Sequence, residues 1–358
     1  MPKILVLNNY PLDAVWDEVR RGDTPDHLLF GINYFSERGY ECEILPAQEG
    51  APVSSINRWL QKLRFPLDLG DIAQQREVLK RVNQSDLIYA ACGTQTSALA
   101  CLRGLGLFHK PIVCVVHHPL NQGRLTWLRK PFLKMVKNGT DAFACLSHCV
   151  SEEIGPKAQS LPWGPDAKFY PQASRPGQGA VAFGRTGRDF ITFGKGASAA
   201  GVPGKIICTE NYVTREYGEF GRNVEVLSRP VSKEGWMTYP EINAHLLKAR
   251  VVAIPLTQQT SLAGLTSLLD ALGLGRPVIM TRNKHINLDI EAEGIGRWVE
   301  PGDVQGWATA LKWFESHPDE AQEMGRRARE KVDSGFSSVA FANRLMDIFD
   351  QILCRTKA

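Results

Sequence analysis

Two unbroken apolar runs on either side of a helical pattern constrain the fold more than any other feature of the sequence. The runs are residues 251–256 and 277–280, and continuous apolar sequence of this kind is typical of parallel strands buried on both faces. Between them, one apolar stripe at helical spacing is made by Leu265, Leu268, Leu269 and Leu272. Gly273, Gly275 and Pro277 then end the helix. A strand, a helix and a second strand in this order predict a βαβ unit.

The start of this helix predicts an anion-binding site. In a βαβ unit, the loop that leaves the first strand, here residues 257–264, faces the ligand. It ends in Gly264-Leu265-Thr266-Ser267, where unpaired backbone N–H groups and the helix dipole favour a phosphate. Thr266 and Asp270 lie one turn apart and off the leucine face, so both are placed to meet a ligand. The alternative is an ordinary helix cap followed by a solvated aspartate.

The same alternation of apolar runs and helical patterns fills the rest of the chain and predicts a parallel α/β architecture. A polar stretch rich in proline and glycine interrupts it at residues 170–179, where we expect a domain boundary. The sequence therefore predicts one Rossmann-like domain over 1–172 and a second over 173–336. A helix over 337–358 would pack back on the first domain.

Composition places the protein among ordinary globular enzymes. The chain has 358 residues, enough for two domains, and its formal net charge of +4 indicates no particular polyanionic partner. Eight cysteines are scattered without a CxxC pair, so we expect reduced thiols in a cytoplasmic protein. The sequence shows no signal peptide and no run of about 18 apolar residues. The protein is thus expected to be soluble or peripheral on a membrane.

A glycine-rich turn with two arginines follows the predicted strand at residues 180–183. It reads Gly184-Arg185-Thr186-Gly187-Arg188. Glycine lets the backbone approach a ligand closely, and guanidinium groups bind phosphate oxygens in bidentate fashion. The alternative is a tight turn with two surface arginines. Because this turn and the helix start at Gly264 both favour anions, we favour a shared phosphate site.

Two histidines end the strand predicted over residues 112–117. His117 and His118 lie at the carboxyl end of a parallel strand, where function usually resides in open α/β sheets. Adjacent histidines point in different directions, and no third ligand has suitable spacing, so we predict no metal site. A structural histidine is the alternative.

The sequence of residues 251–279 resembles the signature found in the carboxyl-terminal half of family 4 glycosyltransferases. The shared pattern is an apolar strand ending in Pro-Leu, a Gly-x-Thr-x-Leu-Leu-acidic-Ala helix, and then Gly-x-Pro-Val-Ile. Residues 161–171 resemble the family's Pro-x-Gly-x-Asp…Phe-x-Pro segment, and the resemblance is strongest over 180–332. It implies a GT-B fold, in which two Rossmann-like parallel-sheet domains face a central cleft. It also implies transfer of a sugar from a nucleotide diphosphate, with UDP favoured, with retention of configuration and without a metal or other cofactor.

The resemblance also implies roles for residues of the donor site. The helix start formed by Gly264, Leu265, Thr266 and Ser267 would hold the diphosphate. Asp270 would bind the ribose hydroxyls. Arg188 is the first choice for neutralising the departing diphosphate, Arg185 the second and Lys195 a weaker candidate.

On the acceptor side, the resemblance gives His117 the position that lines the acceptor site, with His118 as the alternative. An imidazole there would accept the proton of the acceptor hydroxyl or hydrogen-bond the sugar. The sequence departs from the family pattern in two places. Leu262 stands where a glutamate usually holds the donor sugar, and the loop at residues 8–11 lacks the usual glycines.

Two stretches mix basic and aromatic residues, at 57–65 and 124–137. This composition is typical of a helix on an anionic membrane surface, and an ordinary amphipathic helix packed on the sheet is the alternative. A membrane location would suit a lipid-linked acceptor, whereas a sugar or glycan would suit a soluble one. No nucleic-acid-binding module is recognisable. Two other functions remain open: a nucleotide-sugar epimerase of the same fold, and a nucleotide-sugar-binding protein without catalysis.

Overall fold

A computed structural model describes residues 1–47, 68–121, 126–172, 177–230, 236–257 and 261–357. The chain forms two compact units. The first contains residues 1–21, 26–163 and 338–358, and the second contains residues 22–25 and 164–337. The basic and aromatic stretch at 57–65 and part of that at 124–137 lie outside the described residues.

The first unit contains, within the described residues, a six-stranded parallel sheet in the order β2-β1-β3-β4-β5-β6. Its strands are β1 (Lys3–Leu7), β2 (Glu41–Ile44), β3 (Leu87–Ala90), β4 (Ile112–Val116), β5 (Ala142–Cys145) and β6 (Ala158–Ser160). Its helices are α1 (Leu12–Arg21), α3 (Ile72–Arg81), α4 (Ser97–Gly104), α5 (Thr126–Gly139), α6 (His148–Ile154) and α12 (Ser338–Lys357).

The second unit repeats this architecture with the strand order β12-β11-β10-β7-β8-β9 in its described part, again with every pair parallel. Its strands are β7 (Ala180–Phe183), β8 (Gly204–Thr209), β9 (Val224–Arg229), β10 (Val251–Ile254), β11 (Val278–Thr281) and β12 (Gly296–Val299). Its helices are α7 (Phe190–Ala200), α8 (Tyr239–Leu246), α9 (Leu265–Gly273), α10 (Val304–Ser316) and α11 (Pro318–Asp333).

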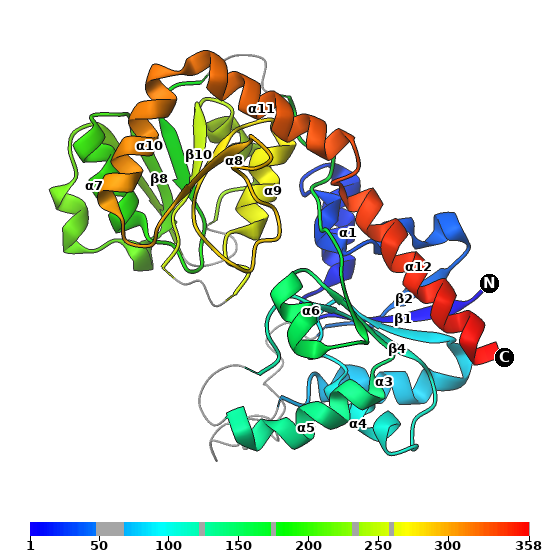
Figure 1. Cartoon of the computed structure of the whole chain (residues 1–358). Coiled ribbons are helices and arrows are strands. Elements are labelled where there is room, and N and C mark those ends of the chain that lie inside the picture. Colours follow the sequence, from blue (N-terminus) through cyan, green and yellow to red (C-terminus); the bar gives the residue numbers. More distant parts are fainter. Residues whose placement is uncertain (48–67, 122–125, 173–176, 231–235, 258–260, 358) are drawn as a thin grey trace. The chain divides into compact units, whose positions relative to one another are not determined.

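Helices cover both faces of the second sheet, as expected for strands without a polar face (Figure 1). On one side, Phe193 of α7 and Trp307 of α10 pack on alternate residues of the strands, such as Ala253. On the other side lies α9, whose Leu268 and Leu272 are fully buried. The predicted βαβ unit around residues 251–280 is therefore confirmed.

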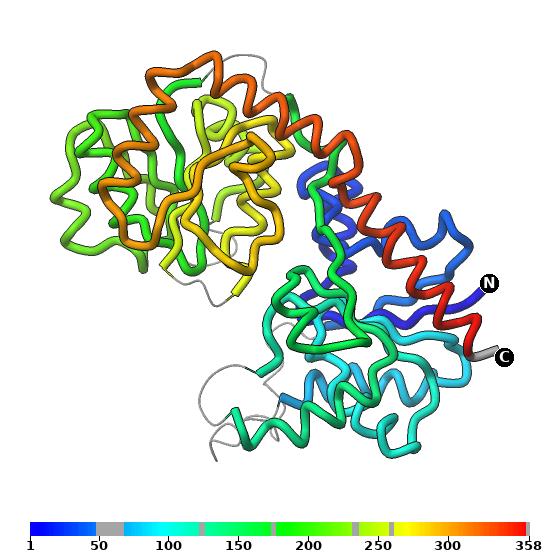
Figure 2. Tube along the Cα trace, viewed as in Figure 1, coloured from blue at the N-terminus to red at the C-terminus, as the bar shows by residue number. Residues whose placement is uncertain are grey.

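The C-terminal helix α12 belongs to the first unit (Figure 2). Its Phe349 packs edge-on against Tyr89 of β3, with ring centroids 5.5 Å apart, and against Phe35, with centroids 5.1 Å apart. Tyr40 donates a hydrogen bond to Asp350 on the same helix. The face of the first sheet opposite α3, α4 and α5 is thus completed by residues from the far end of the chain.

The structure divides the chain between residues 163 and 164, earlier than the boundary at 172 that the proline- and glycine-rich stretch suggests. Residues 164–171 belong to the second unit because they pack on it closely. A β-carbon at Gly164 would overlap the backbone of Phe336 and Ser337, and the Tyr170 hydroxyl reaches α9. The boundary of the second unit therefore follows from the packing of residues 164–171 and does not coincide with the stretch rich in proline and glycine.

All eight cysteines are described, and each is a free thiol in the structure. Among the described residues, no helix combines the length and the hydropathy that crossing a bilayer requires.

Candidate functional site

Strands β7 and β10 are neighbours in the second sheet although residues 184–250 separate them in sequence. The chain moves outward from β7 through β8 and β9, then returns to place β10 on the other side of β7. The order of strands reverses at this pair, and such a switch point is where open α/β sheets bind ligands, at the carboxyl ends of the strands. The glycine-rich turn after β7 and the loop that leads to α9 both leave from this point.

The start of α9 presents backbone N–H groups without a side-chain cap. The helix begins after Gly264, which has a φ of 86° and makes no side-chain cap bond, and Leu265 N donates to Leu262 O at 3.2 Å. A β-carbon at Gly264 would lie 2.8 Å from Ile254 Cγ2 and 3.0 Å from Met280 Cε. Position 264 therefore requires glycine for two reasons: the backbone has a positive φ, and there is no space for a side chain. The result is a helix N-terminus seated directly on β10 and β11.

The glycine-rich turn is fastened to the end of β10. Thr257 N donates to Gly187 O at 3.0 Å, and Asp189 N donates to Pro255 O at 3.1 Å. Arg188 forms an isolated antiparallel bridge with Leu256 between these two bonds. These contacts bring the two predicted anion-binding features together at one edge of the sheet.

Arg188 lies beneath this edge rather than on its surface, with an exposed fraction of 7%. Its Nε donates to Phe183 O at 3.0 Å, Nη1 to Thr186 O at 2.8 Å and Nη2 to Ser267 Oγ at 2.8 Å. Burial lowers the pKa of Arg188 to about 10, so the guanidinium stays charged at neutral pH. The side chain thus supports the turn and places a positive charge beside the first turn of α9.

The other two basic candidates lie in different surroundings. Arg185 is exposed at the tip of the turn, where its guanidinium lies 5.6 Å from the centroid of the Trp236 ring. Lys195, in the middle of α7, pairs with Glu216 and Glu219 at 3.9 Å and 3.6 Å. Arg185 is therefore available to a ligand at the edge of the sheet, whereas Lys195 is held by two carboxylates.

Asp270 is buried within the second unit, with only 3% of its surface exposed. Its Oδ1 accepts a hydrogen bond of 2.5 Å from the hydroxyl of Tyr170. Burial raises the pKa of Asp270 to about 7, against the opposing effects of the Tyr170 hydrogen bond and the Arg188 charge. The family resemblance assigns this carboxyl group to the ribose of a donor nucleotide. In this structure it is hydrogen-bonded to the hydroxyl of Tyr170 instead.

The exposed part of the α9 start is small. Thr266 is exposed and Leu265 half-buried, whereas Ser267 is buried and occupied with Arg188. Leu262, at the position where the family 4 pattern has a glutamate, is buried, with an exposed fraction of 8%. The exposed polar side chain at this helix start is therefore that of Thr266, and residue 262 supplies no carboxylate.

In the first unit, His117 follows β4 at the carboxyl edge of the sheet. Its Nε2 lies 2.8 Å from Ala91 O. A carbonyl can only accept, so Nε2 carries the proton and Nδ1 is the acceptor. Burial lowers the pKa of His117 to about 4, so the ring is neutral at physiological pH.

The ring of His117 also packs on Phe30, with centroids 4.8 Å apart, and Phe30 stacks on Trp163 at 5.2 Å. Phe30 has a φ of 49°, a conformation that costs about 1–3 kcal/mol in a non-glycine residue. His118, in contrast, is exposed. His117 is therefore the histidine whose orientation the fold fixes.

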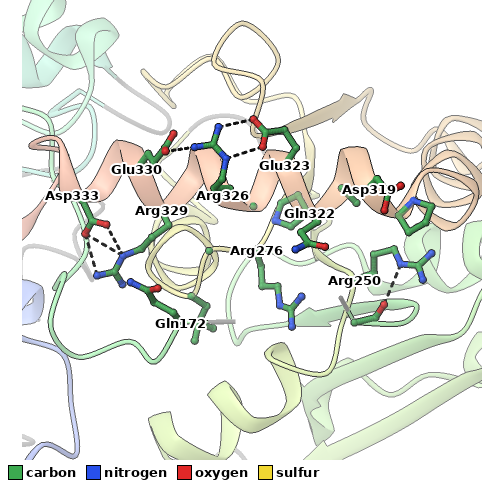
Figure 3. A pocket seen from close by; sticks show the side chains of 17 residues that line it. Gln172, Arg250, Arg276, Asp319, Gln322, Glu323, Arg326, Arg329, Glu330 and Asp333 are labelled. Carbon is green, nitrogen blue, oxygen red and sulfur yellow. Dashed lines mark hydrogen bonds and ion pairs between the residues drawn. The ribbon is translucent and has the colours of Figure 1, made fainter. Parts of the chain in front are cut away.

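A separate cavity of about 570 Å³ lies at the opposite, amino-terminal end of the second sheet. Figure 3 shows Arg250, Arg276 and Arg329 among the residues of its wall. Arg250 donates to the carbonyls of Gly177 and Glu315, and Arg329 to that of Gly273. These arginines tie the backbone together, and the cavity is remote in the fold from the start of α9.

Among the described residues, no group of three or more histidine, cysteine or acidic side chains is arranged to hold a metal ion.

Comparison of this structure with solved structures identifies the type of fold. Sucrose-phosphate synthase from Thermosynechococcus elongatus superposes with a TM-score of 0.68 at 15% identity, covering 99% of this chain and 100% of the other. The chain has a GT-B fold. A glycosyltransferase from Rickettsia africae (TM-score 0.69, 14% identity) covers 98% of both chains. HepE from Anabaena, solved in complex with UDP, has a TM-score of 0.66 at 12% identity and covers 98% of this chain and 100% of its own. No family model matches the sequence, and the search of curated proteins found no match.

Two features of this GT-B fold were absent from the sequence analysis. Tyr170 lies in the segment that resembles the family pattern, but nothing in its sequence signals a bond to Asp270, a hundred positions away. Trp236 lies near Arg185, and the sequence around this tryptophan contains no pattern that predicts the contact. The assignments made to Arg188, Arg185, Asp270 and His117 stay predictions.

Proposed function

We propose that this protein is a glycosyltransferase that moves a sugar from a nucleotide diphosphate, most readily UDP, to a hydroxyl group of an acceptor, with retention of configuration. The observation that carries this proposal is the junction of two anion-favouring features at the switch point of the second sheet. Arg188 of the turn donates to Ser267 in the first turn of α9, whose N-terminus has no side-chain cap. Several similar structures contain UDP or UDP-glucose, which suits an anion site of this kind.

In this mechanism the protein stabilises the charge that develops on the leaving diphosphate. The backbone N–H groups of Thr266 and Ser267 in the first turn of α9 would donate to the phosphate oxygens, whereas that of Leu265 donates to Leu262 O at 3.2 Å. The buried charge of Arg188 adds to the helix dipole in a medium that screens it weakly. Arg185, exposed at the tip of the turn, would contact the diphosphate directly. Each group is in place before reaction, so little reorganisation is needed when the sugar leaves.

Asp270 would hold the ribose and His117 the acceptor side. A neutral imidazole with a pKa of about 4 is a weak base but a good hydrogen-bond acceptor through Nδ1. We therefore assign His117 to orienting a sugar hydroxyl rather than to removing its proton. The reaction needs no metal in this scheme, because the leaving charge is met by the helix start and the two arginines.

The test begins with binding. Thermal shift with UDP, GDP, ADP and dTDP would identify the nucleotide, because ligand at about 100 Kd stabilises the folded state by roughly 2.7 kcal/mol. Release of UDP from UDP-sugars is then measured with candidate acceptors, in EDTA and in magnesium, and the anomeric configuration of the product is read by NMR. The absence of any nucleotide shift would overturn the proposal.

Two other functions have distinct outcomes in the same assay. A nucleotide-sugar epimerase would convert the sugar without an acceptor. A binding protein without catalysis would give the thermal shift but no turnover, an outcome made relevant by Leu262 in place of the usual glutamate. Transfer that depends on an added acceptor separates the proposed function from both.

We also propose that α5 brings the first unit to an anionic membrane surface. Trp127 of this helix is 64% exposed, and Lys130 and Lys134 are exposed one turn apart. Lys130, Lys134 and Lys137 line a cavity of about 490 Å³ whose wall includes apolar Leu133. Co-sedimentation with phosphatidylglycerol vesicles, compared with phosphatidylcholine vesicles, tests this. Lys130→Glu with Lys134→Glu should abolish a preference for the anionic vesicles.

A further inference from the structure

Tyr170 holds the carboxyl group that the proposed function assigns to the ribose. Its hydroxyl donates to Asp270 Oδ1 at 2.5 Å, and both side chains are 3% exposed. A ribose binds a carboxylate in the same way, by donating from its 2′- and 3′-hydroxyl groups. A tyrosine hydroxyl and a ribose hydroxyl are therefore equivalent donors for one acceptor.

The position of the tyrosine ring is built into α9. Gly273 lies one turn after Asp270, and a β-carbon there would overlap the Tyr170 ring. The ring thus rests against a helix surface that lacks a side chain at this point, with its hydroxyl directed at Asp270. Any larger residue at position 273 would displace it.

The segment that precedes Tyr170 is also anchored. Arg329 of α11 donates to Ala167 O at 2.7 Å and to Gly273 O at 2.9 Å, joining the segment before Tyr170 to the end of α9. Phe169 packs edge-on against Tyr239 of α8, with ring centroids 5.8 Å apart. The Tyr170 hydroxyl therefore reaches Asp270 from a fixed support, and the side chain has to rotate to release the carboxyl.

From this geometry we propose that Tyr170 is a specificity-determining residue that competes with the ribose of the donor nucleotide for Asp270, an inference that rests on the proposed function. Binding exchanges one hydroxyl for another on the same oxygen, and such an exchange contributes little net free energy. The protein consequently discriminates weakly between a ribonucleotide and its 2′-deoxy counterpart. Removing the tyrosine hydroxyl leaves a buried acceptor unsatisfied, and the ribose then gains the full hydrogen bond.

The test measures the affinities of UDP and 2′-deoxy-UDP for the full chain by calorimetry. The wild-type protein should bind the two within about threefold of each other, since the exchange is nearly neutral. Tyr170→Phe keeps the ring and its seat on Gly273, and should strengthen UDP binding about tenfold, equivalent to one hydrogen bond to a charged group. Binding of 2′-deoxy-UDP should gain less, so the ratio of the two affinities rises.

Two controls keep a structural effect apart from competition. Tyr239→Phe removes a tyrosine hydroxyl from the same region of the unit and should leave the ratio unchanged. In an Asp270→Asn background, Tyr170→Phe should no longer raise the ratio, because the carboxylate is gone. Melting curves confirm that each variant is folded.

The outcomes separate the two proposals. An unchanged ratio in Tyr170→Phe, with UDP bound by the wild type, overturns the role of Tyr170 and leaves the glycosyltransferase proposal standing. A strong wild-type preference for UDP over 2′-deoxy-UDP also overturns it. If neither wild type nor variant binds UDP, the proposed function fails and this inference fails with it.

Discussion

Replacing Gly264 by alanine should damage both the stability of the second unit and its nucleotide site. The φ of 86° costs an alanine about 1–2 kcal/mol. The new methyl group would lie 2.8 Å from Ile254 Cγ2 and 3.0 Å from Met280 Cε, and overpacking of this kind costs about 1–3 kcal/mol. Together these predict a loss of roughly 2–5 kcal/mol, which lowers the melting temperature of a unit of this size by about 5–15 °C.

The matched control is Gly201→Ala at the end of α7. Gly201 has a φ of 69°, and a β-carbon there would meet nothing within 4 Å, so this variant carries the conformational cost alone. Thermal melts of the two variants should differ by the packing cost, about 1–3 kcal/mol. UDP should stabilise the Gly201 variant as it does the wild type, but not the Gly264 variant, whose helix start is displaced. Equal stability losses, or equal UDP shifts, would refute the reasoning.

Three further predictions concern the charged and polar residues of the site. The pKa of Asp270 is raised to about 7 in the folded state, whereas an aspartate in the unfolded chain has its ordinary pKa of 3.8. Between these two values the folded protein holds a proton on Asp270 that the unfolded chain has lost. Unfolding free energy should therefore fall by about 1.4 kcal/mol per pH unit between pH 4 and 7 from this group, and Asp270→Asn, followed by denaturant titration at each pH, should remove that slope. Arg188→Lys cannot reach three acceptors, so it should weaken UDP binding at least tenfold in calorimetry; unchanged affinity would contradict the role of the buried guanidinium. His117→Gln keeps a neutral donor and acceptor and should retain kcat within about tenfold, whereas a loss of a hundredfold or more would indicate a general base.

The strands of both sheets could be predicted because buried parallel strands are marked locally by continuous apolar sequence. The segment at residues 180–183 is predicted and observed with the same bounds. Residues 24–39 behave differently. Thr24 and Pro25 are typical of a helix start, Gly39 of a helix end, and the apolar spacing between them predicts one helix. The structure instead has two short 3-10 helices, η1 (Asp26–Leu29) and η2 (Ile32–Arg38). The break occurs at Phe30 and Gly31, whose φ values are both positive. Gly31 packs against Ala342 of α12, a contact that no local pattern can reveal.

The candidate site divides in the same way. The turn at residues 184–188 and the helix start at Gly264 can be proposed from the sequence because each is a local motif. Their junction follows from the order of strands, which places β7 beside β10. The burial of Arg188, the partner of Asp270 and the tautomer of His117 depend on side chains from distant segments. Spacing in sequence therefore selects candidate residues, whose roles stay predictions, but it does not reveal what surrounds their side chains.

The membership of α12 in the first unit has a consequence for synthesis on the ribosome. Phe349 fills the face of the first sheet against Tyr89 and Phe35, and residues 338–357 are made after the whole second unit. The first six strands emerge early, yet the part of their surface that Phe349 and α12 cover stays open until the rest of the chain has been translated. The second unit, whose residues are nearly continuous in sequence, is the first that can be completed. An apolar part of the first sheet therefore stays exposed while residues 164–337 are synthesised, a period in which aggregation competes with folding.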